Sequence, residues 1–137
     1  MIYVFDASFV GTLIIPDEKN ITVEKKYKQM KTHDEIWVPS VFTYEMSNIF
    51  MNILRRKRNT YDEVIELLSI LYAIRLVYDH ETGIEYSKKL LHLCNDYSLS
   101  SYDAAYLELA ERKNAVLCTM DDALLAAAKR YGVRVLS

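Results

Sequence analysis

The sequence has 137 residues, of which 51% are apolar, so we expect one domain that buries a substantial core. The formal net charge of −2 excludes a global positive field, so any contact with nucleic acid must come from a local patch. No apolar run approaches the ~18 residues that span a bilayer. Cys94 and Cys118 are far apart in the chain and make a poor disulfide framework. We therefore expect a cytoplasmic protein with reduced cysteines and no membrane contact.

The first half of the chain contains two predicted strands, each followed by helices. Residues 2–7 form a short, β-rich apolar run, which is typical of a strand buried on both faces of a parallel sheet. Ser8 is placed to cap a short helix that ends before Pro16. The next predicted elements are a charged surface helix over 21–31, a strand over 35–39 and a long helix over 41–58, capped by Ser40.

The second half of the chain continues the alternation. The capping-box spacing of Thr60 with Glu63, and of Thr82 with Glu85, predicts helices over 61–73 and 83–96. The remaining predicted elements are a strand over 74–78, a helix over 102–113, a strand over 115–120, a helix over 121–131 stopped by Gly132, and a strand over 133–136. This order predicts an α/β fold in a single domain, residues 1–137. Helices would flank a central parallel sheet of about five short strands.

Two acidic residues fall at the carboxyl ends of predicted strands. Asp6 shares a strand face with Val4, and Asp121 shares one with Leu117, so each apolar row ends in a carboxylate. In parallel sheets, sites gather at the carboxyl ends of the strands. An ionised carboxylate at the edge of a buried face needs a partner. The sequence does not decide whether that partner is a metal cation, an arginine or a helix N-terminus.

Two further acids lie near the starts of predicted helices. Asp103 is in the first turn of the helix over 102–113, where the helix dipole alone favours an acid. Glu45 lies one turn into the helix over 41–58 and shares a stripe with Asn48, which also suits a plain solvated face. An α/β sheet would nevertheless bring both acids to the edge that holds Asp6 and Asp121, so we predict a four-carboxylate site.

Other chemistries find little support in the residue pattern. The glycines form neither a G-x-G-x-x-G nor a G-x-x-x-x-G-K motif, and the three histidines lack zinc-ligand spacing. There is no nucleophile elbow. A phosphoacceptor domain needs a pair of acids after the first strand, and the sequence has no such pair. Oxygen-only ligands suit Mg²⁺ or Mn²⁺. The residues themselves therefore argue for metal-assisted phosphoryl chemistry.

Four segments of the chain resemble the PIN-domain family and, within it, the VapC-like toxins of toxin–antitoxin pairs. The segments are YVFDAS with Asp6, VPSVFTYEMSNIF with Glu45, LSSYDAAYLELA with Asp103, and VLCTMDDALLAAAKRYGVRVL with Asp121. Their order and spacing are more specific than any one alone. Strand alternation and the match at Thr119 favour Asp121 over its neighbour Asp122 as the fourth acid.

The resemblance implies a PIN-like fold and a metal-dependent endoribonuclease that cleaves single-stranded or loop RNA. One or two Mg²⁺ or Mn²⁺ ions would be bound directly by Asp6, Asp103 and Asp121, and by Glu45 directly or through water. Supporting residues would be Ser8, Asn48 and Thr119. A homodimer and a small antitoxin that blocks the site are also implied. Two alternatives stay open: a non-catalytic PIN-like module that binds RNA or protein, and an RNA-processing nuclease that is not a toxin.

Two other groups of residues are possible RNA contacts. The basic run Arg55, Arg56, Lys57 and Arg58 would contact phosphates, although basic residues also suit a helix C-terminus. Tyr44, Tyr102 and Tyr106 flank the acids, where they could stack on bases. Tyrosines at such positions are more often packing residues, so the predicted site leaves them out.

Overall fold

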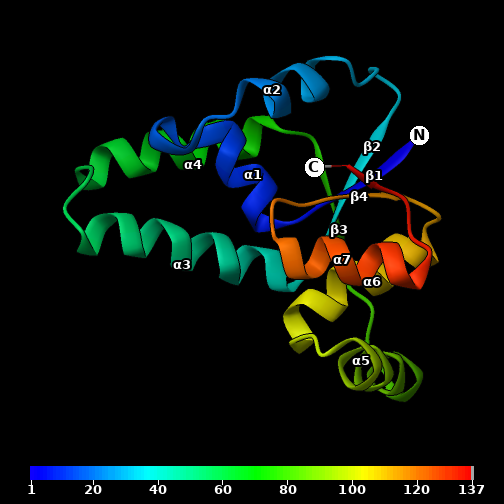
Figure 1. Cartoon of the computed structure of the whole chain (residues 1–137). Helices are drawn as coiled ribbons and strands as arrows, with labels where there is room; N and C mark the ends of the chain where they lie inside the picture. Colours follow the sequence, from blue (N-terminus) through cyan, green and yellow to red (C-terminus); the bar gives the residue numbers. More distant parts are fainter. Residues whose placement is uncertain (137) are drawn as a thin grey trace.

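The computed structural model describes residues 1–136 as a parallel five-stranded sheet surrounded by helices (Figure 1). The strands are β1 (Ile2–Phe5), β2 (Glu35–Pro39), β3 (Leu76–Asp79), β4 (Val116–Cys118) and β5 (Val135–Leu136). Their order in the sheet is β3-β2-β1-β4-β5, so β1 is central, and Val4 pairs with both Trp37 and Leu117. Because every pairing is parallel, the carboxyl ends of the strands share one edge. The predicted α/β architecture is confirmed.

The helices alternate with the strands as predicted. They are α1 (Ala7–Ile14), α2 (Ile21–Lys28), α3 (Val41–Arg55), α4 (Tyr61–Ala73), α5 (Ile84–Tyr97), α6 (Ser101–Arg112) and α7 (Asp122–Tyr131), with a 3-10 turn at Pro16–Glu18. In Figure 1, α3 and α4 run side by side and extend away from the sheet as a helical hairpin. No helix within residues 1–136 is long and apolar enough to cross a membrane. Cys94 and Cys118 are both free thiols.

The central helix α6 packs against β1, β2 and β4 and contributes much of the core. Its residues from Ala104 to Ala110 are all buried, which agrees with the nearly continuous apolar sequence. The buried acid among them, Glu108, is paired with Arg112. The guanidinium of Arg112 donates from Nε to Glu108 Oε1 over 2.7 Å and from Nη2 to Asp79 Oδ2 over 2.6 Å. This ion cluster joins the end of α6 to the end of β3.

Some local predictions at helix ends are wrong. Asp6, not Ser8, caps α1, because β1 ends two residues earlier than predicted and the Asp6 side chain accepts the backbone N–H of Phe9. Ser40 stands at the start of α3 but makes no capping bond, since its backbone is already helical. Thr60 and Glu63 do form the predicted capping box, whereas Thr82 and Glu85 do not.

The two remaining differences have backbone causes. Gly83, with a φ of 107°, is the residue that precedes α5 at the capping position, so Thr82 lies one residue too early to cap the helix. The long helix ends at Arg55 rather than at residue 58, because Lys57 adopts a φ of 55° and turns the chain toward α4. Most of the basic run therefore lies in the turn between α3 and α4.

We predict that Arg112→Met lowers the free energy of unfolding by about 2–4 kcal/mol, because it leaves two buried carboxylates without a cation. Burial acts to raise the pKa of Asp79, but the hydrogen bonds and charge of Arg112 lower it overall. This contribution is therefore present at neutral pH and is lost as the pH falls through that lowered pKa, below the ordinary ~3.9 of an aspartate. Urea denaturation at several pH values measures the difference.

Lys88→Met is the matched control, since Lys88 makes only an exposed ion pair with Glu85 at 3.5 Å. Exposed pairs are worth about 0–1 kcal/mol. If the Arg112 and Lys88 variants lose the same small amount of stability, the ion cluster does not stabilise the fold.

Candidate active site

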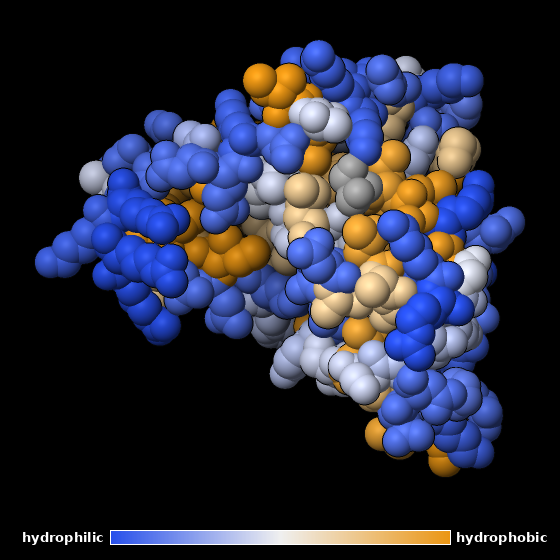
Figure 2. All heavy atoms as spheres, in the orientation of Figure 1, coloured by the Kyte–Doolittle hydropathy of each residue, from blue (hydrophilic) through white to orange (hydrophobic). Residues whose placement is uncertain are grey.

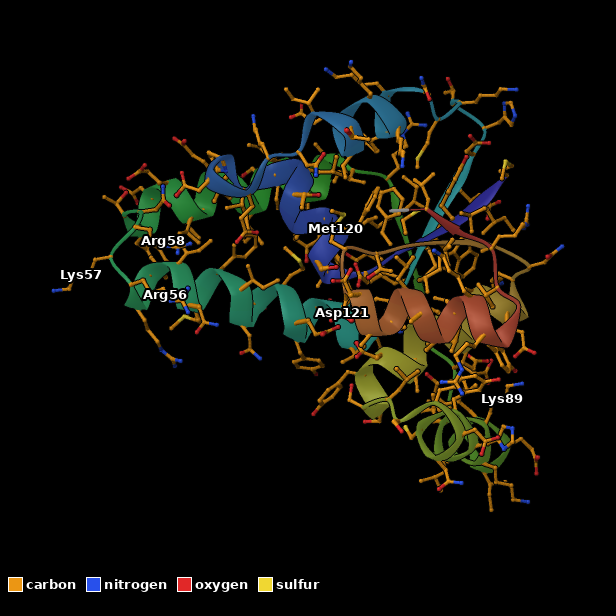
Figure 3. All side chains as sticks on the ribbon, in the orientation of Figure 1. Arg56, Lys57, Arg58, Lys89, Met120 and Asp121 are labelled. Carbon is orange, nitrogen blue, oxygen red and sulfur yellow. The ribbon has the colours of Figure 1, made fainter. Side chains whose placement is uncertain are left out.

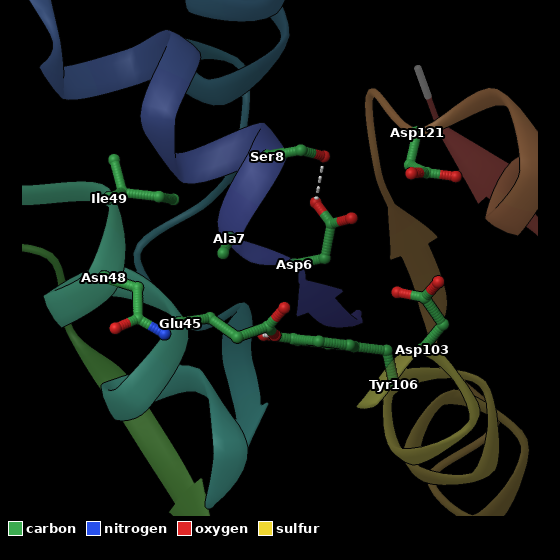
Figure 4. A pocket seen from close by; sticks show the side chains of 9 residues that line it. All are labelled: Asp6, Ala7, Ser8, Glu45, Asn48, Ile49, Asp103, Tyr106 and Asp121. Carbon is green, nitrogen blue, oxygen red and sulfur yellow. Dashed lines mark hydrogen bonds between the residues drawn. The ribbon is translucent and has the colours of Figure 1, made fainter. Parts of the chain in front are cut away.

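A cleft of about 290 Å³ opens at the carboxyl edge of the sheet and brings all four predicted acids together (Figure 4). Asp6 comes from the end of β1, Glu45 from α3, Asp103 from the first turn of α6, and Asp121 from the loop between β4 and α7. The other residues that line the cleft are Ala7, Ser8, Asn48, Ile49 and Tyr106. The fold thus collects, at one place, acids that are up to 115 residues apart in the chain, from Asp6 to Asp121.

Asp6 is the most buried of the four acids, with 5% of its surface exposed. Its Oδ1 accepts hydrogen bonds from the backbone N–H of Phe9 at 2.8 Å and from the Ser8 hydroxyl at 2.7 Å. Its Oδ2 accepts one from the Thr119 hydroxyl at 2.5 Å. A helix N-terminus and two hydroxyls therefore donate hydrogen bonds to this buried carboxylate. These three bonds occupy three of its roughly four acceptor positions.

The two hydroxyls also bind the loop that follows β4. The Ser8 hydroxyl accepts the backbone N–H of Met120 at 2.9 Å, and the Thr119 hydroxyl accepts that of Asp121 at 2.9 Å. Each hydroxyl also donates a hydrogen bond to one oxygen of Asp6. Two hydroxyl relays, one through Ser8 and one through Thr119, therefore connect the loop to the carboxylate. The position of Asp121 is thereby fixed relative to Asp6.

Asp121 is itself the N-cap of α7, and its Oδ1 accepts the backbone N–H of Leu124 at 2.8 Å. Its neighbour Asp122 is the first residue of α7 and lines a different hollow, together with Asn20 and Met120. Within residues 1–136 the cleft is therefore lined by Asp121 and not by Asp122.

Glu45 is half-buried and is held by a residue that the sequence prediction left out. The hydroxyl of Tyr106 donates to Glu45 Oε1 over 2.6 Å, and the Tyr106 side chain is only 1% exposed. Burial and the neighbouring Glu45 raise the pKa of Tyr106, so its hydroxyl stays protonated and acts as a donor. The sequence spacing could have pointed to this residue, since Tyr106 lies three residues after Asp103 and therefore on the same stripe of α6.

The acids influence one another electrostatically. Burial raises the pKa of Asp6, against the hydrogen bonds from Thr119 and Ser8, and Asp103 raises it further. Burial also raises the pKa of Glu45, with Asp103 and Asp6 adding to the effect against the bond from Tyr106. The pKa of Asp103 is raised by burial and by Asp121. Three carboxylates therefore resist ionisation, partly because of other acids in the cleft.

The donor chemistry of the cleft fits a hard divalent cation. Four carboxylates line it, and Ser8 and Asn48 add further oxygens. Within residues 1–136, however, no three His, Cys, Asp or Glu side chains converge closely enough to enclose one metal ion. The fit is therefore one of ligand type and charge, without a formed coordination shell.

The basic run lies at the other end of α3 from the cleft. Figure 3 shows Arg56, Lys57 and Arg58 at the tip of the α3–α4 hairpin, well away from Asp121. Glu45 and Arg56 are eleven residues apart, or about 16 Å along a helix axis. The same tip is strongly hydrophilic in the space-filling view (Figure 2). All four basic residues are exposed, and none forms an ion pair with an acid within the described part of the chain.

Comparison with known proteins assigns the family. The PIN domain profile matches residues 3–131, so the chain belongs to the PIN domain family. Ribonuclease VapC3 from Pyrobaculum aerophilum is 28% identical over 118 residues, which cover 86% of this chain and 88% of that protein.

Two solved structures share the fold at low sequence identity. VapC20 from Mycobacterium tuberculosis, described as a Sarcin-Ricin loop cleaving toxin, matches with a TM-score of 0.66 and 15% identity over 93% of this chain and 95% of that one. A toxin–antitoxin complex from Klebsiella pneumoniae matches with a TM-score of 0.63 and 13% identity over 98% and 96% of the two chains.

We predict that Asp103→Asn raises the melting temperature in EDTA by about 2–6 °C, because it removes one charge from a repulsive cluster at almost constant volume. The raised pKa of Asp103 means that its ionised form destabilises the fold above that pKa. The advantage of the variant should therefore be full at neutral pH and vanish as the pH falls toward about 4. Thermal melts across this pH range measure it.

Asp122→Asn is the control, since this exposed acid lies outside the cleft and should change the melting temperature little. A lower melting temperature for Asp103→Asn would instead mean that Asp103 acts only as a favourable first-turn acid of α6.

Proposed function

We propose that this chain is a metal-dependent endoribonuclease that hydrolyses RNA phosphodiester bonds at Asp6, Glu45, Asp103 and Asp121. One observation carries the proposal: four carboxylates from four separate elements line one cleft, where burial and like charge raise the pKa values of Asp6, Glu45 and Asp103. Such an arrangement destabilises the fold when no ion is bound, and it favours the binding of a cation. Membership of the PIN domain family and the relationship to Ribonuclease VapC3 support the same activity.

The proposed cofactor is Mg²⁺ or Mn²⁺, as one or two ions. Asp6, Asp103 and Asp121 would bind metal directly, and Glu45 directly or through water. When bound there, such an ion would neutralise phosphate charge, activate water as a nucleophile and stabilise the leaving oxygen.

The residues of the chain would orient the groups that act. The hydroxyls of Ser8 and Thr119 hold both oxygens of Asp6, so this carboxylate cannot rotate freely. Tyr106 occupies Oε1 of Glu45 and leaves Oε2 to accept a hydrogen bond from the attacking water. The raised pKa of Glu45 makes it a better proton acceptor than an ordinary glutamate. We therefore assign Glu45 Oε2 as the atom that orients and deprotonates that water.

We further propose that the protein is the toxin of a toxin–antitoxin pair, a cytoplasmic homodimer blocked by a small antitoxin protein. The relationship to Ribonuclease VapC3 and the fold shared with the Klebsiella pneumoniae complex support this role. The alternatives are an RNA-processing nuclease that is not a toxin and a non-catalytic module. The presence of all four acids in the cleft favours a catalytic protein over a binding module.

RNA cleavage should require Mg²⁺ or Mn²⁺ and stop in EDTA. Asp6→Asn, Asp103→Asn and Asp121→Asn should each lower the rate at least ~100-fold, since loss of a ligand removes several kcal/mol of transition-state stabilisation. Cleavage of end-labelled RNA measures both effects. Mg²⁺ should also raise the melting temperature of the wild type, and much less that of Asp103→Asn.

Asp122→Asn again serves as the control, because it lies outside the cleft and should remain active. Activity that persists in excess chelator would contradict the metal mechanism. In cells, growth arrest by the wild type but not by Asp103→Asn would support the toxin role, and unaffected growth would favour an RNA-processing nuclease.

Neutralising two residues of the basic run, as in Arg56→Gln with Arg58→Gln, should weaken RNA binding and reduce the slope of log K against log salt by about 1–2. These exposed side chains would release counterions when they contact phosphates. Titrations at several salt concentrations measure the slope. An unchanged slope would show that the run is only a solvated turn between α3 and α4.

A further inference from the structure

Two exposed tyrosines, Tyr44 and Tyr102, directly precede acids of the cleft in the sequence. The side chains of Tyr44 and Tyr102 are 74% and 59% exposed, whereas Tyr106 is buried and bonded to Glu45. Within residues 1–136, neither exposed tyrosine makes a side-chain hydrogen bond or a ring contact. The expectation that all three are packing residues is therefore wrong for two of them.

Both tyrosines occupy the same place relative to an acid. Tyr44 directly precedes Glu45, and Tyr102 directly precedes Asp103, so each Cα lies about 3.8 Å from that of an acid in the cleft. Each also lies one helical turn before a second residue that lines the cleft. Those residues are Asn48 on α3 and Tyr106 on α6.

The two helices are tied together at this point. The hydrogen bond from Tyr106 to Glu45 joins α6 to α3. The two exposed tyrosines thus lie in the first turns of two helices that meet at the carboxylates. Neither tyrosine lines the cleft itself, but side chains on a helix lean toward its N-terminus, so both positions suit a ring at the rim of the cleft.

The charge of the cleft explains why aromatic contacts would matter there. None of the residues that line it is a lysine or an arginine. Its four carboxylates repel phosphates, and the basic run is about 16 Å away along α3. Besides a bound divalent ion, RNA beside the acids would gain from an attraction that does not depend on phosphate charge. Stacking of a base on an aromatic ring provides one, and it serves every base because each has a π-face.

We propose that Tyr44 and Tyr102 stack on unpaired bases on either side of the phosphate that is cleaved. This inference rests on the proposed ribonuclease function and names two positioning residues for it. A base within a duplex is already stacked on its neighbours, so the two rings select RNA whose bases are free to turn outward.

Tyr44→Ala and Tyr102→Ala should each raise KM for a short unpaired RNA about 5- to 100-fold, with kcat nearly unchanged. Stacking is made equally in the ground state and the transition state, so its loss appears in KM. Tyr44→Phe and Tyr102→Phe keep the ring and should behave like the wild type. Leu91→Ala is the control for the loss of a large exposed side chain, since Leu91 is 70% exposed on α5 and belongs neither to the cleft nor to the basic run.

Two binding measurements separate stacking from other roles. An abasic oligonucleotide has the phosphates without the bases, so the wild type and both alanine variants should bind it equally. For oligoadenylate, the loss of affinity should be the same at every salt concentration, because stacking releases no counterions. A loss that extends to the abasic probe would overturn the proposal.

The remaining outcomes are equally decisive. If both alanine variants cleave RNA like the wild type while Asp103→Asn is inactive, the stacking role is wrong and the ribonuclease function stands. If they retain RNA cleavage but sediment differently from the wild type, the tyrosines belong to a contact between copies of the chain. A wild type that neither binds nor cleaves RNA would contradict the proposed function itself.

Discussion

The buried carboxylate of Asp6 is the interaction on which the rest of the site depends. It follows the central strand, caps α1 and accepts hydrogen bonds from both hydroxyls that hold the loop after β4. Removing those hydrogen bonds would leave a buried charge without partners and would release the loop that carries Asp121. The same contacts set where the N-terminus of α1 stands on the sheet. One side chain thus joins the central strand, the first helix and the fourth acid.

Within residues 1–136, the fold contains two clusters of acids, one neutralised by an arginine and one without a cationic side chain. Between β3 and α6, Arg112 neutralises Asp79 and Glu108, and it lowers the pKa of Asp79 against the effect of burial. In the cleft, the described residues include no cation, and the pKa values of Asp6, Glu45 and Asp103 are raised. The first arrangement stabilises the folded chain by itself. The second leaves charge available to an ion or a ligand, which is the physical difference between a structural acid and a reactive one.

Sequence patterns predicted the sheet, the helices and the convergence of the four acids, because apolar periodicity and the rules of parallel sheets fix where strand ends meet. They did not predict Tyr106, since a buried tyrosine in an apolar helix reads as packing until Glu45 is seen opposite its hydroxyl. The capping of α1 was wrong because the end of β1 depends on tertiary hydrogen bonds. The exposure of Tyr44 and Tyr102 was equally hidden, since it depends on which neighbouring elements cover each helix.

The two hydroxyl relays have a consequence for how the protein is made. They join residues near the two ends of the chain, since 113 positions separate Asp6 from Thr119 and 112 separate Ser8 from Met120. A nascent chain has neither Thr119 nor Asp121 until more than a hundred residues after Asp6 have been synthesised. Incomplete translation products therefore lack the fourth acid and the contact that fixes the first one. The cleft is assembled only in a polypeptide that reaches Asp121, so a ribosome that stops before this residue releases a fragment without the four acids.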